Sequence, residues 1–263
     1  MSQNPTSESL PLRVVQITDT HLFADDRQTM LGHPTNAPFQ SVIAEVARLQ
    51  PQPDLLLLTG DLSQDETEAS YGILRSHLDS LQIPTYWIAG NHDQELAVME
   101  QVLKSDWISG DKVFQRGGWD FILLNSMIPG QPQGRLSEET LLWFEQQLQR
   151  LGDCPILVAV HHHLLPIGSA CMDRIQLENP EAFFEIVDRH SQVKVVICGH
   201  IHQEFDQMRD KIRYLGSPST CIQLKPFSDN FTMDTQSPGF RMLLLYPDGR
   251  CETEVRRVDY AIV

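Results

Sequence analysis

Five short apolar runs recur along the chain, and each is followed directly by a cluster of polar residues. A continuous apolar run of this length, without polar alternation, is typical of a strand that is covered on both faces. The sequence therefore predicts five buried strands that end at polar positions. The runs are Leu12–Thr18, Asp54–Thr59, Pro84–Ala89, Ile156–Val160 and Val193–Cys198.

Segments between these runs carry apolar residues at helical spacing, and the last quarter of the chain changes to short alternating stretches. The spacing predicts helices over Phe39–Leu49, Thr67–Leu81, Gln94–Leu103, Glu138–Leu151 and Pro180–His190. From Gln203 onward, alternation broken by turn residues predicts antiparallel strands. Helix–strand alternation with a β-rich tail predicts an α/β fold, a four-layer α/β/β/α sandwich of two mixed β-sheets flanked by helices. We expect residues 1–11 to be a flexible lead-in and residues 12–263 to form a single domain.

The polar clusters are rich in metal-ligand side chains. They are Asp19-Thr20-His21, Gly60-Asp61, Gly90-Asn91-His92-Asp93, His161-His162-His163 and Gly199-His200-Ile201-His202. Because α/β proteins build their sites at the carboxyl ends of strands, we expect these clusters to meet. The candidate ligands are Asp19, His21, Asp61, Asn91, His161, His200 and His202.

Seven candidate ligands exceed what one metal ion needs, and they suit two ions that share a bridging group. Asp61 is the natural bridge, since a carboxylate has two oxygens and no other ligand stands beside it. Nitrogen and oxygen donors without thiolate favour Fe, Mn, Zn or Co. Two such ions catalyse the hydrolysis of phosphate esters. We assign His92, which is next to Asn91, as general acid or as donor to the phosphoryl group, and we expect Asp93 to orient it or to cap the following helix.

The charge, the cysteines and the lack of long apolar segments exclude several classes of protein. With 20 Lys and Arg against 35 Asp and Glu, the formal charge is −15, which argues against a protein that binds the nucleic-acid backbone. The five cysteines show no CxxC spacing and are expected to be free thiols in a reducing compartment. Residues 1–11 lack the features of a signal peptide, and no run has the ~20 apolar residues of a membrane span. We therefore expect a cytoplasmic protein, monomer or homodimer, that interacts with neither nucleic acid nor membrane.

The order DxH, GD, GNHD, H and GHxH over Asp19–His202 resembles the calcineurin-like metallophosphoesterase superfamily. Further stretches resemble one branch, the class III 3′,5′-cyclic-AMP phosphodiesterases of bacteria. These stretches are Gln16–Phe23, Gly60–Asp65, Cys198–Glu204, Ser217–Pro226 and Asn230–Arg241.

The resemblance implies hydrolysis of cyclic AMP to 5′-AMP by two divalent ions, Fe²⁺ and/or Mn²⁺. It implies one ion on the positions of Asp19, His21, Asp61 and His202, and the other on those of Asp61, Asn91, His161 and His200. It also places the nucleotide phosphate against His21, Asp61, Asn91, His92 and His202. On this reading the catalytic residues are His92, Asp61 and Asn91, and the partner is a small cyclic nucleotide.

Other interpretations remain open at this point. A broader phosphodiesterase acting on 2′,3′-cyclic nucleotides or other small diesters would use the same site. A non-catalytic binding platform would be expected to lose ligands or His92, and all are present. We expect His162 and His163 to hydrogen-bond or to line the segment Leu164–Asn179, which is predicted as an irregular flap near the site.

Overall fold

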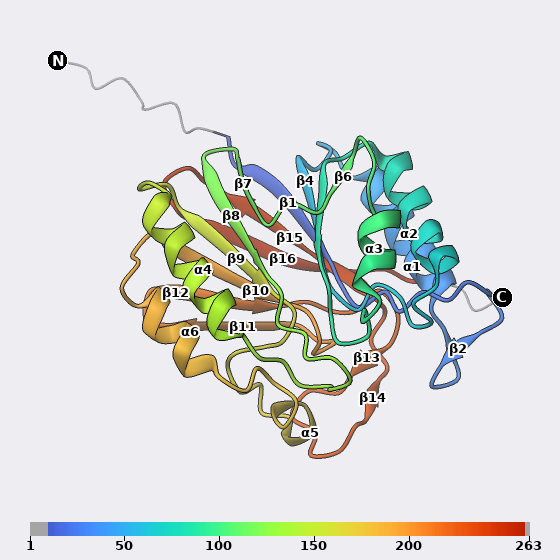
Figure 1. Ribbon diagram of the computed structural model, residues 1–263. Helices are drawn as coiled ribbons and strands as arrows, with labels where there is room; N and C mark the ends of the chain where they lie inside the picture. The colour runs from blue at the N-terminus through green and yellow to red at the C-terminus, as the bar shows by residue number, and fades with distance from the viewer. Residues whose placement is uncertain (1–9, 261–263) are drawn as a thin grey trace.

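Two six-stranded mixed sheets pack face to face, with helices on both outer sides, in the computed structural model, which describes residues 10–260 (Figure 1). The predicted α/β/β/α sandwich is confirmed. The prediction that residues 1–11 are flexible falls almost wholly on residues 1–9, which lie outside the described part of the chain.

The first sheet has the order β16-β15-β1-β4-β5-β6. Strands β1, β4, β5 and β6 run parallel, whereas β15 pairs antiparallel with both β1 and β16. The C-terminal hairpin therefore extends a parallel sheet begun by the N-terminal half. The bounds are β1 Leu12–Ile17, β4 Leu55–Thr59, β5 Thr85–Ile88, β6 Ile108–Ser109, β15 Gly239–Leu245 and β16 Cys251–Arg257.

The second sheet has the order β11-β12-β10-β9-β8-β7. Strands β8, β9, β10 and β12 run parallel, and the two edge strands β7 and β11 are antiparallel to their neighbours. The bounds are β7 Val113–Arg116, β8 Trp119–Leu124, β9 Ile156–Val160, β10 Val193–Cys198, β11 Phe205–Arg209 and β12 Ile212–Gly216.

Helices α1, α2 and α3 cover the first sheet, and α4 and α6 cover the second (Figure 1). Ser137 caps α4, since its hydroxyl accepts a hydrogen bond from the backbone N–H of Thr140 at 3.0 Å, and Thr67 caps α2 in the same way. The bounds are α1 Asn36–Arg48, α2 Glu68–Leu81, α3 Leu96–Val102, α4 Glu138–Arg150, α5 Ala170–Asp173 and α6 Pro180–Val187.

Three large apolar clusters fill the three interfaces between neighbouring layers, and a fourth, small cluster contains Ile167, Met172, Ile201 and Leu224. Along β1, Val15 and Ile17 pack under the helices of the first sheet, whereas Leu12 and Val14 pack between the two sheets. The second sheet has its own core beneath α4 and α6. Since successive side chains of a strand point to opposite faces, a strand buried on both faces must be apolar throughout. This explains the continuous runs in the sequence.

Several short elements were not predicted. The expected loop Phe23–Pro38 contains a small hairpin, β2 (Thr29–Met30) with β3 (His33–Pro34), and already holds the start of α1. The strands β6 and β7 were missed, and the strand expected at Thr220–Leu224 shrinks to β13 (Gln223–Leu224), which pairs with β14 (Met233–Asp234). Strands of two to four residues carry too little periodicity to be recognised in a sequence.

A buried glutamine joins the two sheets just before the polar clusters begin. The side-chain amide of Gln16, on β1, donates to the hydroxyl of Thr59 at 2.9 Å and to the carbonyl of Cys198 at 2.9 Å. Its carbonyl oxygen accepts from the hydroxyl of Ser217 at 2.5 Å. Because Thr59 ends β4 and Cys198 ends β10, Gln16 fixes the carboxyl ends of strands from opposite sheets relative to each other.

A bilayer-crossing helix is absent from residues 10–260. The five cysteines are unpaired, as the sequence predicted.

Candidate metal centre

The polar clusters meet where the carboxyl ends of strands from both sheets come together. The first sheet supplies the residues after β1, β4 and β5, and the second supplies those after β9 and β10. Parallel pairing aligns these strand ends, so that the backbone N–H of Asp19 donates to the carbonyl of Gly60 at 2.9 Å, and that of His21 to the carbonyl of Asp61 at 2.9 Å. The seven predicted ligands come from two sheets that only tertiary packing brings together.

Five of the seven candidate ligands have a left-handed backbone, with φ between 42° and 69°. Such a conformation costs about 1–3 kcal/mol for a residue other than glycine, and strain of this kind gathers at functional sites. Here it turns the chain sharply at each strand end, so that the side chain after the turn points into the centre. The residues are Asp19, His21, Asp61, His200 and His202.

The glycines before the ligands permit their close approach. A methyl group at Gly90 would overlap the carboxylate of Asp61 and would lie 2.7 Å from Cε1 of His161. A methyl group at Gly60, where φ is +95°, would lie 2.5 Å from Nδ1 of His161. The Gly-Asp and Gly-Asn pairs of the sequence are thus steric requirements of the centre.

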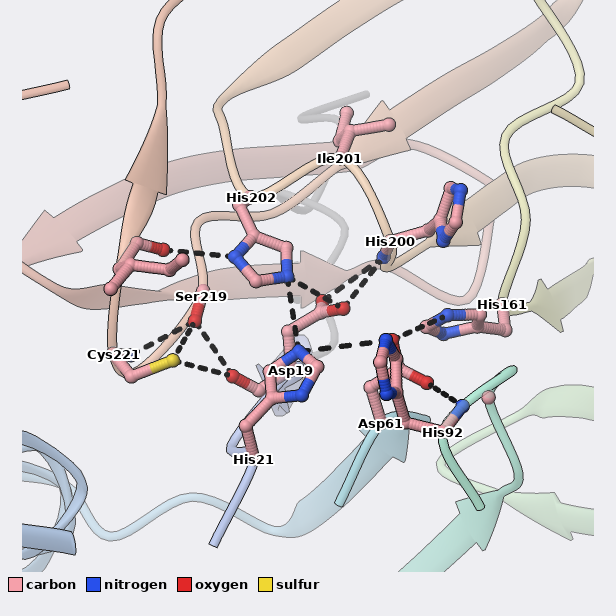
Figure 2. A network of polar contacts seen from close by, with 12 residues as sticks. Asp19, His21, Asp61, His92, His161, His200, Ile201, His202, Ser219 and Cys221 are labelled. Atoms are coloured by element: carbon pink, nitrogen blue, oxygen red, sulfur yellow. Dashed lines mark hydrogen bonds and ion pairs between the residues drawn. The ribbon is translucent and has the colours of Figure 1, made fainter. Parts of the chain in front are cut away.

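Short distances join the candidate ligands into one cluster (Figure 2). Nε2 of His202 lies 3.3 Å from Oδ1 of Asp19 and 3.2 Å from Nε2 of His21. His21 lies 3.7 Å from the carboxylate of Asp61, whose Oδ2 is 3.3 Å from Nε2 of His161. Asp61 therefore lies in the middle of the cluster.

The other two candidates join the same cluster. Oδ1 of Asn91 is 3.2 Å from Nε2 of His161. The backbone N–H of His200 donates to both oxygens of Asp19 at 3.0 Å, and its ring centroid is 5.1 Å from that of His161. All seven predicted ligands are thus brought together, and their roles as ligands stay predictions.

Each of the four histidines among the candidate ligands has one ring nitrogen within hydrogen-bond distance of a protein oxygen. A nitrogen that donates in this way carries the hydrogen, so the other nitrogen presents a lone pair. The pairs are Nδ1 of His21 with Oε1 of Gln64 (2.8 Å), Nδ1 of His161 with the Thr59 carbonyl (2.7 Å), Nε2 of His200 with the Ile175 carbonyl (3.1 Å), and Nδ1 of His202 with the Ile222 carbonyl (2.9 Å).

This arrangement fits divalent cations. The lone pairs on Nε2 of His21 and His202 face each other at 3.2 Å, next to two buried carboxylates. Lone pairs at that distance repel, whereas a cation between them would be coordinated by both. The donors are imidazole, carboxylate and amide, a set that suits the transition metals predicted from the sequence.

The pKa values of the histidines reflect a balance between burial and attraction to the carboxylates. Burial lowers the pKa of His161, but attraction to Asp61 outweighs burial and raises that pKa to about 9. Attraction to Asp19 likewise outweighs burial and raises the pKa of His202. Burial lowers the pKa of His21 to about 3.

The prediction that Asp93 caps the following helix is wrong. Helix α3 begins at Leu96 after an extra turn, and its N-terminus has no side-chain cap. The carboxylate of Asp93 instead accepts hydrogen bonds from the backbone N–H groups of Gly90 (2.9 Å), Leu62 (3.0 Å) and Ser63 (3.1 Å). It thereby fastens the loop after β5 to the loop after β4. Burial, together with the nearby charge of Asp61, raises the pKa of Asp93 to about 7.

His92 lies at the edge of the cluster and is only partly buried. Its backbone N–H donates to Oδ1 of Asp61 at 2.8 Å, and its ring makes an edge contact with that of His21 at 4.9 Å. One of its ring nitrogens lies within 4.8 Å of ligand-type atoms of His21 and Asp61. Its ring is therefore close enough to act on a group held by the cluster.

His162 and His163 behave as predicted. Nδ1 of His162 accepts from the hydroxyl of Ser126 at 2.7 Å, and Nε2 donates to the carbonyl of Pro132 at 3.2 Å, so both nitrogens are engaged. Nε2 of His163 lies 3.5 Å from Asp173, in the segment expected as a flap.

Sequence reasoning missed the side chains that hold the ligands in place. The hydroxyl of Ser219 donates to the carbonyl of Asp19 at 2.7 Å, and Sγ of Cys221 lies 3.5 Å from the same oxygen (Figure 2). Gln64 lies between His21 and His92. In the sequence it stands three residues after Asp61, within the resembling stretch Gly60–Asp65, but nothing there indicates that its amide contacts two histidines.

Comparison with known proteins agrees with this geometry. The family profile for calcineurin-like phosphoesterases matches residues 12–204, which include every predicted ligand. The chain is 46% identical over 256 residues to a 3′,5′-cyclic-nucleotide phosphodiesterase of Nostoc sp. (strain PCC 7120), with 97% of this chain and 96% of that protein covered.

It is also 42% identical over 258 residues to the 3′,5′-cyclic adenosine monophosphate phosphodiesterase CpdA of Pseudomonas aeruginosa, with 98% and 94% covered. Among solved structures, a dimetal phosphatase from Danio rerio shares the fold, with a TM-score of 0.70 at 14% identity over 94% of this chain and 96% of that one.

Proposed function

The chain belongs to the calcineurin-like phosphoesterase family, and on that premise we propose that it hydrolyses 3′,5′-cyclic AMP to 5′-AMP and so lowers cyclic AMP in the cell. The observation that carries the proposal is similarity over nearly the full length to relatives named as phosphodiesterases of cyclic nucleotides. The site supports it, because the seven candidate ligands and His92 are all present and the candidate ligands lie buried close together.

In this proposal two metal ions occupy the cluster. Asp19, His21, Asp61 and His202 would hold one, and Asp61, Asn91, His161 and His200 would hold the other, so that Asp61 would be shared by both. Iron and manganese are the metals that we propose. When bound, such ions supply Lewis acidity to the phosphoryl group and activate water for attack.

The chain's own residues position the substrate and handle its charge. We propose that the cyclic phosphate lies against His21, Asp61, Asn91, His92 and His202. A water oxygen forms a bond to phosphorus while the bond from phosphorus to the 3′ oxygen breaks. The water gives up one proton, and the 3′ oxygen takes up one, so that the product is 5′-AMP with a 3′ hydroxyl. His92 donates a hydrogen bond where negative charge develops, and Asn91 and Asp61 hold the reacting phosphate in place.

The proposal also covers domain organisation, location and partners. Residues 12–263 act as a single catalytic domain in the cytoplasm, as monomer or homodimer. The substrate is a small cyclic nucleotide, and neither nucleic acid nor a membrane is a partner. The net charge of −15 does not oppose an anionic substrate, because bound cations reverse the local field.

The test is hydrolysis by metal-stripped protein with Fe²⁺, Mn²⁺, Mg²⁺ or Zn²⁺ added back. The substrates are 3′,5′-cyclic AMP, a 2′,3′-cyclic nucleotide and bis(p-nitrophenyl) phosphate. We expect metal-dependent formation of 5′-AMP, with kcat/KM highest for 3′,5′-cyclic AMP. A higher kcat/KM for the 2′,3′-cyclic nucleotide would replace this proposal by the broader phosphodiesterase. Inactivity with every metal would reject the enzymatic function.

A further inference from the structure

Gln64 connects a candidate metal ligand to the candidate donor of the reaction. It lies in the loop after β4, where its backbone N–H donates to the carbonyl of Leu22 at 2.9 Å. Its side-chain amide reaches between two rings. Oε1 is 2.8 Å from Nδ1 of His21, and Nε2 is 3.3 Å from Nδ1 of His92.

The direction of these two hydrogen bonds follows from the contacts of His21. Nε2 of His21 faces Asp61 and Nε2 of His202, so it is the nitrogen turned toward a metal and must present a lone pair. Nδ1 of His21 then carries the hydrogen and donates it to Gln64. The amide atom that receives it must be the oxygen, since an amide NH₂ group cannot accept.

The other end of the amide is therefore an NH₂ group, which can only donate. Its partner, Nδ1 of His92, must accept and cannot carry a hydrogen in this contact. The neutral imidazole has one hydrogen, which is then on Nε2. Each hydrogen bond from His21 through Gln64 to His92 therefore has only one possible direction.

We propose that Gln64 is a positioning residue for His92, which holds the ring in one orientation and fixes its hydrogen on Nε2. The inference rests on the proposed function for the role of His92 and deepens it. With the hydrogen on Nε2, His92 is a hydrogen-bond donor to an oxygen of the phosphoryl group or to the departing 3′ oxygen. A His92 ring with the hydrogen on Nδ1 would offer these oxygens a lone pair, which would repel developing negative charge.

The competing explanation is that Gln64 only supports His21 and thereby the metals. A double-mutant cycle separates the two explanations, because residues that act through each other are not additive. The variants are Gln64→Met, which keeps the length of the side chain and removes both hydrogen bonds, His92→Ala, and the two combined. Gln192→Met is the matched control, since the partly buried side chain of Gln192 donates to the carbonyl of Leu148 at 3.0 Å, at the amino end of β10 and thus away from the cluster.

With Mn²⁺ bound and the metal content measured, we expect Gln64→Met to lower kcat for 3′,5′-cyclic AMP about tenfold, with KM changed less than about twofold. For bis(p-nitrophenyl) phosphate the loss is less than about threefold, because nitrophenolate departs without a donor. In the His92→Ala background, adding Gln64→Met changes kcat less than about twofold. The control variant keeps the wild-type kcat.

A second readout does not depend on turnover. Protein labelled with ¹⁵N-histidine, without metal and with Zn²⁺, is measured by long-range ¹H–¹⁵N correlation, and His92 is assigned from the spectrum of His92→Ala. We expect the wild-type ring to carry its hydrogen on Nε2 in a single form. In Gln64→Met we expect signals of the Nδ1–H form as well.

An equal loss from Gln64→Met with and without His92 would overturn the proposal and leave only the support of His21. A His92 hydrogen on Nδ1 in the wild-type spectrum would overturn it too. Failure of the proposed function is distinguishable from both, because wild-type protein would then form no 5′-AMP, whereas the hydrogen position on His92 would still be measured.

Discussion

Gly90→Ala tests whether close packing of the ligands sets their geometry. In the structure a methyl group at Gly90 would overlap the Asp61 carboxylate and would lie 2.7 Å from Cε1 of His161. Ordinary carbon–carbon contacts begin at about 3.5 Å. The ring of His161 would therefore have to retreat by about 0.8 Å, and the carboxylate of Asp61 would have to move as well. Both are predicted ligands, and Asp61 is the predicted bridge.

We expect two separate losses. Overpacking of this kind costs about 1–3 kcal/mol of the free energy of unfolding. A displacement of nearly 1 Å at reacting groups costs about 100-fold in kcat/KM. Urea denaturation measures the first loss, and hydrolysis of 3′,5′-cyclic AMP at saturating Mn²⁺ measures the second. The number of metal ions per chain is also expected to fall.

Gly72→Ala is the matched control, since a methyl group at Gly72, inside α2, meets no atom within 4 Å. There alanine is expected to leave kcat/KM unchanged and to stabilise the protein by about 0.5–1 kcal/mol, because glycine is a poor helix former. If Gly90→Ala kept wild-type metal content and kcat/KM, the steric argument for the centre would be refuted.

Three further outcomes follow from the structure. Removal of metal by a chelator is expected to lower Tm by roughly 11–22 °C, because each of the two proposed ions at about 100 times Kd contributes about 2.7 kcal/mol; an unchanged Tm would contradict a metal-filled cluster. Burial lowers the pKa of Lys112, whose ammonium is 2.7 Å from the carbonyl of Trp87, to about 8 from its usual 10.5. As pH rises, the folded chain releases this proton before the unfolded chain does. The free energy of unfolding should therefore rise between pH 8 and 10.5 relative to that of Lys112→Met. Urea denaturation at each pH measures this difference, and a difference that stays constant would contradict the prediction. Ser137→Ala removes the cap of α4 and should cost about 1 kcal/mol in urea denaturation without changing kcat, whereas full stability would mean that the bond to Thr140 is dispensable.

The sequence by itself determined the layers of the fold and the members of the cluster. Runs such as Leu55–Leu58 are apolar at every position because both faces of β4 are buried, and that signal is local to the strand. The ligand-type residues stand directly after such runs, so parallel pairing predicts that those of one sheet meet at one edge, whereas the packing of the two sheets brings both groups together. The glycines next to Asp61 and Asn91 are also visible in the sequence, although the steric reason for them is not.

Tertiary structure alone decided how those residues are held. Gln16 is a polar residue within a mostly apolar strand, and nothing local reveals that it bonds to Cys198 on the opposite sheet. Asp93 stands where a helix cap is expected, yet its carboxylate binds backbone groups about thirty residues away. The contacts of Gln64 are likewise with two rings, His21 and His92, that come from different loops. Periodicity and strand-end position are properties of neighbouring residues, whereas these hydrogen bonds join segments distant in the chain, and their partners are fixed only when the two sheets pack.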